Sequence, residues 1–304
     1  MDNTIIDKVI DNSPNCPLCS SESTELIWST DTKLNGIITT RKIYKCSSCT
    51  HMYAVQKGLQ TAGLANNFYL EPLSPEQKTR QGRLAHYLYY SNLIMPGDSV
   101  LDVGAGRGGL SIALNEISKR YSFDVSIHLI EPFDPLNRFL LGYFEEGSVF
   151  STPSQLPNTY DFIIMHEMLE HVEDPKRLIQ EICQYSHGGT VFYVTVPGHS
   201  ICQENLVEAN SRDFAAPDHI QYFTLGSIKT LFSQIGFQRV RQTRIDDFYP
   251  SWAQRPLDFT KRDRSLKTLS DWLGNEGMHI QLLVSGFTQE RFDVGSGKLE
   301  NDSP

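Results

Sequence analysis

The chain has 304 residues, of which 39% are apolar and 21% charged, a composition ordinary for a globular protein with one large domain and a smaller module. No apolar run reaches the roughly 20 residues of a membrane-spanning helix, and the polar, acidic N-terminal segment lacks secretory-signal features, so we expect a cytoplasmic protein without a membrane partner. Residues 1–95 hold 9 of the 27 basic and 8 of the 36 acidic residues, which leaves 18 basic against 28 acidic residues in the remainder. This acidic excess argues against a nucleic-acid partner, whose phosphates it would repel.

Four of the six cysteines form two C-x2-C pairs, Cys16 with Cys19 and Cys46 with Cys49. In a reducing compartment such pairs indicate a metal rather than disulfides, and four thiolates complete a closed, structural Zn²⁺ site. A bound metal would also explain how so small and β-rich a segment folds. We therefore predict a zinc-ribbon-like module with its own core over residues 1–55, tail included. Four unrelated buried cysteines, or a redox pair, are the alternatives.

Residues 56–95 are predicted to form a linker followed by a helix. Ser74 is suited to cap that helix, Pro75 fits its first turn, and Gln77 completes a capping-box pattern. The helical spacing of apolar residues extends to Ile94, and the sequence Pro-Gly-Asp then predicts a turn.

From residue 99 onward, predicted strands and helices alternate, which indicates an α/β fold with a doubly wound, seven-stranded Rossmann-like sheet over residues 96–290. An inserted segment, 246–277, interrupts the pattern before the last strand, and the tail 291–304 is expected to be disordered. The predicted strands are 99–104, 126–132, 147–150, 160–166, 189–198, 237–245 and 278–287, and the predicted helices are 110–121, 136–144, 174–186 and 225–236.

A glycine-rich loop, LDVGAGRGG at 101–109, closes the first of these strands and opens a helix. Glycines there allow a sharp turn and a close approach of backbone to ligand, and three of them satisfy the dinucleotide pattern G-x-G-x-x-G. Glu131, at the end of the next strand, is suited to bind a ribose diol. The loop alone leaves a nicotinamide cofactor and S-adenosylmethionine (SAM) open. Asp102 favours SAM, because its carboxylate would repel a pyrophosphate but attract an ammonium or sulfonium.

Three blocks in this order resemble class I SAM-dependent methyltransferases. They are LDVGAGRG at 101–108, YDFIIMHEMLEHVEDP at 160–175 and DHIQYFTLGSIKTLFSQIGF at 218–237. The last block resembles the small-molecule branch, which includes ubiquinone-type O-methyltransferases and sugar methyltransferases, some of which carry a four-cysteine module ahead of the SAM domain. The resemblance implies an enzyme that transfers a methyl group from SAM to a small molecule such as a saccharide, a nucleotide-sugar or a secondary metabolite.

The same resemblance implies a cofactor pocket at the carboxyl ends of the strands. The family often reads the adenine with an acid or amide after the third strand, whereas residues 151–154 here are Ser, Thr, Pro and Ser, so the adenine contact stays unassigned. The residues implied in the pocket are Asp102, Gly104, Ala105, Gly106, Gly108, Glu131, Pro132, Met165 and His166.

Methyl transfer to a hydroxyl or a carbon acid needs a general base, and histidine is suited to that role near neutral pH. Glu170 and His171 follow the fourth strand, at the edge where α/β sheets bind ligands. We predict His171 as base or orienting residue, Glu170 as its partner, and His219 as a third residue facing the same site. Purely structural roles are the alternative for all three.

Two further classes of function stay open. A zinc-ribbon-containing RNA methyltransferase would use the cysteine module to read nucleic acid, although in such enzymes the second cysteine pair lies much closer in sequence. A catalytically silent SAM-fold scaffold would use the module for protein contacts instead.

Overall fold

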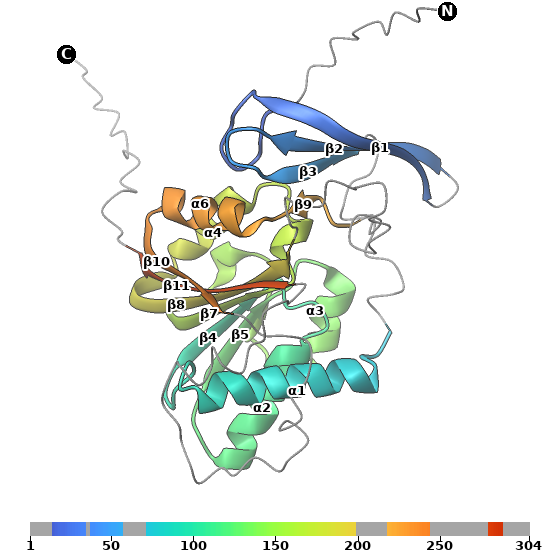
Figure 1. Ribbon diagram of the computed structural model, residues 1–304. Coiled ribbons are helices and arrows are strands. Elements are labelled where there is room, and N and C mark those ends of the chain that lie inside the picture. Colours follow the sequence, from blue (N-terminus) through green and yellow to red (C-terminus); the bar gives the residue numbers. More distant parts are fainter. Residues whose placement is uncertain (1–13, 35–36, 57–70, 199–217, 244–278, 288–304) are drawn as a thin grey trace, which may run out of the picture.

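A computed structural model describes residues 14–34, 37–56, 71–198, 218–243 and 279–287. The predicted insert 246–277 and tail 291–304 lie outside these residues. Within the described ranges, no helix combines the length and apolar character needed to cross a bilayer. The chain builds two sheets, a large one of seven strands and a small one of four (Figure 1).

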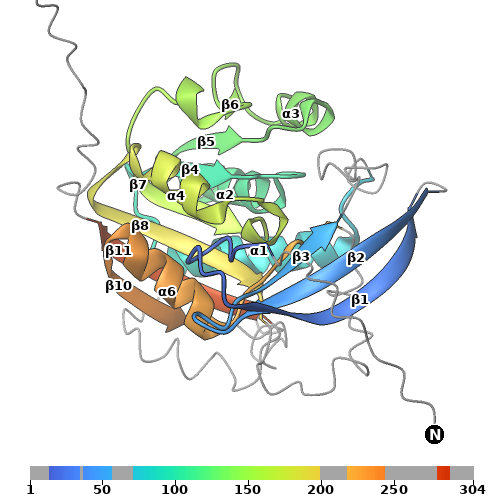
Figure 2. The same ribbon diagram turned by 90° about the horizontal axis from the view of Figure 1, so that it is seen from above.

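The larger sheet has the strand order β10-β11-β8-β7-β4-β5-β6, which can be followed across Figure 2. Strands β4 to β8 pair in parallel, whereas β11 runs antiparallel to both β8 and β10. This confirms the predicted Rossmann-like α/β fold, with one reversed strand near an edge. The strands are β4 (Ser99–Val103), β5 (Ser126–Ile130), β6 (Val149–Phe150), β7 (Tyr160–His166), β8 (Ser186–Pro197), β10 (Phe237–Thr243) and β11 (His279–Phe287).

Helices cover both faces of this sheet (Figure 1). Successive strand residues alternate between two cores: Val100 and Phe162 pack with helices α1 and α2, whereas Leu101 and Ile163 pack with α4 and α6. Central strands that are apolar on both faces, as SVLDV and YDFIIMH are, need this double cover. The helices are α1 (Pro75–Tyr90), α2 (Gly109–Tyr121), α3 (Asp134–Leu140), α4 (Pro175–Cys183) and α6 (Leu225–Ile235), with short 3-10 turns η3 (Pro153–Gln155) and η4 (Leu169–His171).

Local capping signals fix where the helices begin. The capping box predicted at Ser74 is present: the Gln77 amide donates to the Ser74 hydroxyl over 3.2 Å, and the Ser74 amide donates to the Gln77 side chain over 2.9 Å. The end of α1 was predicted too late, at Ile94, because Asn92 adopts the left-handed conformation, with a φ of 55°, directly after the cap residue Ser91, so the helix ends at Tyr90.

The smaller sheet contains β1 (Thr24–Leu34), β2 (Ile37–Cys46), β3 (Met52–Gln56) and β9 (Gln221–Tyr222), in the order β1-β2-β3-β9. We call residues 14–56, which carry the cysteine pairs, the cysteine module. Its strands form antiparallel pairs. The fourth strand of this small sheet, β9, pairs with β3 but comes much later in the chain, after β8 of the large sheet. The sequence did not reveal β9, because a strand of two residues has no readable periodicity.

The prediction of a separate core for the cysteine module was wrong. Cys16, Cys46 and Tyr53 belong to the same buried cluster as Ile228 and Phe232 of α6. The reason is size: a three-stranded sheet this small buries little apolar surface alone, so it packs its inner face onto the large domain.

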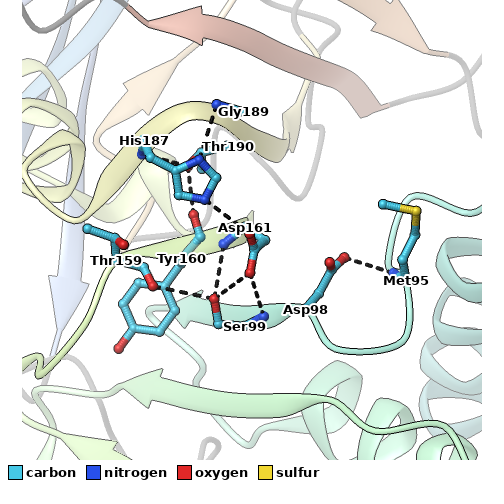
Figure 3. Close-up of polar contacts among 9 residues, drawn as sticks. All are labelled: Met95, Asp98, Ser99, Thr159, Tyr160, Asp161, His187, Gly189 and Thr190. Atoms are coloured by element: carbon cyan, nitrogen blue, oxygen red, sulfur yellow. Dashed lines mark hydrogen bonds and ion pairs between the residues drawn. The ribbon is translucent and has the colours of Figure 1, made fainter.

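Polar contacts tie together the amino ends of the central strands (Figure 3). The carboxylate of Asp161 accepts hydrogen bonds from the amide and the hydroxyl of Ser99, over 2.9 Å and 2.7 Å, and its other oxygen lies 3.0 Å from Nε2 of His187. The hydroxyl of Thr190 donates to the carbonyl of Tyr160. These contacts join β4, β7 and β8 at the edge opposite the glycine loop, which leaves the carboxyl ends of the strands for function.

Candidate functional site

The glycine loop has the backbone conformations that only glycine adopts readily. Gly104, Gly106 and Gly108 have φ angles of 69°, 56° and 65°, in the left-handed region. A Cβ added at Gly108 would lie 2.4 Å from the Leu140 side chain, and one at Gly104 would lie 3.1 Å from Met168. Space as well as conformation therefore explains the glycines at these two positions.

The loop is bound to the end of the neighbouring strand. The amides of Gly104 and Ala105 both donate to the carbonyl of Ile130, over 2.8 Å and 3.0 Å. Glu131 follows directly, and its carboxylate accepts from the amides of Gly106 over 2.7 Å and Phe133 over 2.9 Å. The structure thus places Glu131 beside the glycine loop, where the sequence predicted it.

Glu131 is buried, and burial raises the pKa of its carboxyl above the ordinary value. Two backbone amides oppose this shift, but a carboxylate has about four lone-pair sites, so two amides leave acceptor capacity for the hydroxyls of a ribose. Pro132, the next residue, is exposed at the surface of the same turn.

Asp102, near the end of β4 and just before the glycine loop, is almost fully buried. Only 4% of the residue is exposed, and one carboxylate oxygen accepts a hydrogen bond of 2.6 Å from the hydroxyl of Ser111 in α2. Burial raises the pKa of Asp102 to about 6; the Ser111 hydrogen bond opposes the rise, and the negative charge of Glu131 adds to it. Two acids that repel each other at adjacent strand ends favour a cationic ligand over a phosphate.

Met165 and His166 end β7, and the structure separates them. Met165 is fully buried in the core that lies under α4 and α6, whereas His166 is half-buried. The Nδ1 atom of His166 lies 2.7 Å from the Thr195 hydroxyl, and its Nε2 lies 3.2 Å from the side-chain amide nitrogen of Gln81 in α1. Sequence reasoning missed Gln81, because nothing in α1 indicates that it contacts β7.

The segment after β6, where the adenine contact was left unassigned, is organised by Gln155. Its side-chain oxygen accepts from the amides of Ser151 and Thr152, over 2.8 Å and 3.0 Å. Asn137 of α3 bridges from the Glu131 carbonyl toward the Ser151 hydroxyl, over 3.1 Å and 3.4 Å. Asn137 is a further polar residue beside Glu131 that the sequence did not single out.

Glu170, His171 and His219 are brought together, although 47 residues separate the two histidines. Their ligand-capable atoms all lie within 4.8 Å of one another, and the imidazole rings meet edge to face at 4.8 Å between centroids. Such a set of one carboxylate and two imidazoles could hold a metal ion as well as a proton. Met168, the contact of Gly104, is two residues from Glu170, so this cluster adjoins the glycine loop.

Hydrogen bonding sets the tautomer of His171. Its Nδ1 lies 3.0 Å from the carbonyl oxygen of Asp218, which can only accept, so Nδ1 carries the hydrogen. Its Nε2 is left with the free lone pair, 3.8 Å from the Glu170 carboxylate and too far from it for a hydrogen bond. The side chain is about 30% exposed, and in this tautomer Nε2 is the ring atom that could accept a proton. Asp218 was part of a recognised block but was not assigned this orienting position.

The four paired cysteines form a single cluster. Sγ of Cys16 lies 3.6 Å from that of Cys49, Sγ of Cys19 lies 3.5 Å from that of Cys46, and all four sulfurs are within 4.8 Å of one another. Zn–S bonds of about 2.3 Å give sulfur–sulfur edges of about 3.8 Å in a tetrahedron, so these spacings suit Zn²⁺. The hydrogen bond from Cys49 lowers the pKa of Cys16 to about 5, which favours a thiolate there.

A glycine loop, a buried acid at the end of the neighbouring strand and a polar cluster after β7 are together typical of α/β proteins that bind a nucleoside-containing cofactor at the carboxyl edge of the sheet. A family profile described as a methyltransferase domain matches residues 72–242, more than half of the chain. The chain therefore belongs to this methyltransferase-domain family.

Curated relatives are similar to it over shorter stretches. A ubiquinone biosynthesis O-methyltransferase of Nitrosospira multiformis is 30% identical over 112 residues, which cover 34% of this chain and 44% of the relative. Its counterpart in Photorhabdus laumondii is 36% identical over 123 residues, covering 38% and 49%. The chain thus spans less than half of these relatives. A solved SAM-dependent methyltransferase from Archaeoglobus fulgidus is 15% identical with a TM-score of 0.46, over 73% of this chain and 98% of the other.

Proposed function

We propose that this protein is a SAM-dependent methyltransferase that acts on a small molecule, such as a saccharide, a nucleotide-sugar or a secondary metabolite. The observation that carries the proposal is the pair of acids beside the glycine loop. Asp102 and Glu131 are both buried and repel each other, so a cofactor with a sulfonium and an ammonium relieves an unfavourable charge that a dinucleotide would worsen. Membership of the methyltransferase-domain family supports the same conclusion.

In this proposal the glycine loop and Glu131 hold the adenosine, with Glu131 accepting from the ribose hydroxyls. Asp102 supplies negative charge under the methionine end, and His166 borders that end. The bound SAM supplies an electrophilic methyl group.

His171 then acts as the general base toward a hydroxyl or carbon acid of the acceptor. Its tautomer supports this role, because Nδ1 binds the Asp218 carbonyl and Nε2 keeps its lone pair. Glu170, buried and 3.8 Å from Nε2, would stabilise the imidazolium that forms. His219 packs against the same ring and would orient either His171 or the acceptor.

For the cysteine cluster we propose a structural Zn²⁺ held by Cys16, Cys19, Cys46 and Cys49. Four thiolates leave no open position for a substrate, so the ion would hold the two cysteine turns together and take no part in the transfer. The sulfur spacings support this assignment.

Calorimetry with SAM and, separately, with NAD tests the cofactor. We expect SAM to bind and NAD to give no heat; tight NAD binding without SAM binding would overturn the assignment. Metal analysis of protein purified without chelator tests the second site, where we expect about one zinc per chain. Cys46→Ser should release that zinc, and Cys183→Ser, which changes a buried cysteine outside the cluster, is the matched control.

A further inference from the structure

The segment 218–222, which holds His219, is bound on one side to the turn that carries Glu170 and His171. The amide of Ile220 donates to the carbonyl of Glu170 over 2.8 Å. The side-chain amide of Gln221 donates to the carbonyls of Val172 and Glu173, over 2.9 Å and 3.2 Å. Backbone and side-chain contacts therefore fix how this segment lies against the proposed base.

The opposite side of the same segment is bound to the cysteine module. The amide of Ala54 donates to the carbonyl of Ile220 over 2.8 Å, and β9 pairs with β3 (Figure 1). Nε2 of His51 lies 2.8 Å from the side-chain oxygen of Gln221, and both residues are buried. Gln221 thus connects His51 of the module directly to the chain that leaves the Glu170–His171 turn.

Arg41 of β2 makes the most unusual contact of this interface. It is 1% exposed, and its guanidinium donates from one nitrogen to both the His219 carbonyl and the Tyr222 hydroxyl, 5.9 Å from the centroid of the Tyr222 ring. Among the described residues, its Nε and Nη1 have no hydrogen-bond partner. A buried cation with neutral partners is costly for folding, so packing alone does not account for it.

We propose that Arg41 and His51 are positioning residues, through which the cysteine module holds residues 219–222 against the Glu170–His171 turn and so aligns the two histidines for the acceptor. The inference rests on the proposed function, because alignment matters only if these histidines serve methyl transfer. It gives the module a role that neither an RNA reader nor a protein-contact knob requires. The cofactor side, bound by the glycine loop, should not depend on these contacts.

Arg41→Met tests the proposal in the full-length, metal-loaded protein, with Lys45→Met as the matched control, since Lys45 lies on the same strand and loses the same charge. Hydrogen exchange followed by mass spectrometry should show residues 218–224 exchanging about tenfold faster in Arg41→Met, and residues 104–112 unchanged. The affinity for SAM should stay within about twofold of wild type. With an accepted substrate, kcat should fall about tenfold at unchanged SAM affinity, and Arg41→Lys should recover part of it, because an ammonium can still donate to the His219 carbonyl.

Two milder variants keep the test decisive if Arg41→Met does not fold. Tyr222→Phe removes only the hydroxyl that Arg41 binds, and His51→Phe keeps a ring against Phe223, whose centroid lies 5.0 Å away, while it removes the contact to Gln221. Faster exchange of 218–224 in either variant supports the proposal; rates equal to those of Lys45→Met in both overturn it. Equal loosening of 104–112 would also overturn it, because the effect would then be global. If the wild-type protein binds no SAM, the proposed function is refuted. The hydrogen-exchange rates of residues 218–224 would still show whether Arg41 and His51 hold this segment in place.

Discussion

The proposed cofactor side of the site and its proposed acceptor side are built in different ways. The cofactor side consists of the glycine loop, the end of β5 and Glu131. Its contacts are hydrogen bonds from backbone amides to the Ile130 carbonyl and to the Glu131 carboxylate. On the proposed acceptor side, Glu170 and His171 lie within 4.8 Å of His219, and the segment 218–222 that carries His219 is hydrogen-bonded to η4 on one side and to the cysteine module on the other. A site of the first kind tolerates changes elsewhere in the fold, whereas a site of the second kind depends on the docking of another part of the chain.

The same contrast separates fixed backbone geometry from side-chain chemistry. The left-handed glycines of the loop, hydrogen-bonded to the Glu131 carboxylate, form a fixed backbone surface that suits a cofactor of constant shape. The His171 side chain is about 30% exposed, so in the proposed mechanism it would be open to an acceptor from solvent. Single substitutions should therefore affect binding of SAM or the transfer step, and rarely both.

His171→Ala should give the largest effect and confine it to the acceptor side. Turnover on an accepted substrate should fall by about 10²–10⁴, the usual loss for a general base, with SAM affinity unchanged. Glu170→Gln should lose less, because it keeps the shape of the partner. Steady-state kinetics and calorimetry check both. His187→Ala, at the opposite edge of the sheet, is the control and should turn over normally. Normal turnover by His171→Ala would remove the base from the mechanism.

Gly104→Val should show the converse, a loss confined to the cofactor side. The substitution forces a β-branched residue into a φ of 69° and drives its Cβ to within 3.1 Å of Met168, so SAM binding should weaken by about 100-fold. Gly147→Val is the matched control: its φ of 87° imposes comparable strain, but its Cβ meets open space outside the loop, so it should cost stability without changing the calorimetric Kd. Equal losses of SAM binding in both variants would contradict a local role for the loop.

A change of pH should distinguish the two sides without mutation. Because the pKa of Asp102 is raised from 3.8 to about 6, the folded apo protein binds this proton more tightly than the unfolded chain. The contribution of Asp102 to stability therefore falls as pH rises from about 4 to about 6 and stays low above that. SAM affinity should change in the other direction, weakening as pH drops below about 6, because protonation removes the charge that attracts the cation.

Asp102→Asn checks the pH prediction. The variant should bind SAM about tenfold more weakly at pH 8 and lose the dependence near pH 6, as followed by calorimetry. Chemical denaturation of the two apo proteins between pH 4 and pH 8 should show the stability difference changing over the same interval. A wild-type affinity that is flat through pH 6 would show that Asp102 does not act by its charge.

Asp161→Asn should give the smallest effect and leave both sides of the site intact. The pKa of Asp161 is lowered chiefly by the hydrogen bond from the Ser99 amide. The charged carboxylate therefore stabilises the fold at pH values above the ordinary pKa of 3.8, and this stabilisation is lost as the pH falls from there through the lowered pKa of the folded protein. The residue is partly exposed, so solvent screening limits the cost to about 0.5–1 kcal/mol in urea unfolding at pH 7. A change in SAM affinity would mean that the two sheet edges are coupled.

The parts of this protein that the sequence alone predicted are those in which a short stretch determines its own geometry. The Ser74 capping box, the glycines of the loop and the placement of Glu131 at a strand end all follow from local steric and hydrogen-bonding rules. The strand–helix alternation predicted the large sheet because buried parallel strands and the helices that cover them have distinct periodicities. The two cysteine pairs predicted a common site from their spacing, and the cluster was found.

Tertiary structure decided what distant segments do to one another. Nothing in the sequence distinguishes Arg41 from other strand residues. Its hydrogen bond to the His219 carbonyl forms where the pairing of β3 with β9 brings two distant parts of the chain together. That pairing also merges the cysteine module with the α6 core, against the expectation of separate cores. Likewise, Nδ1 of His171 carries the hydrogen because a carbonyl 47 residues away accepts it. Local sequence encodes backbone preferences of a few residues, whereas such contacts depend on how much apolar surface each part must bury against another, which no single stretch of the chain specifies.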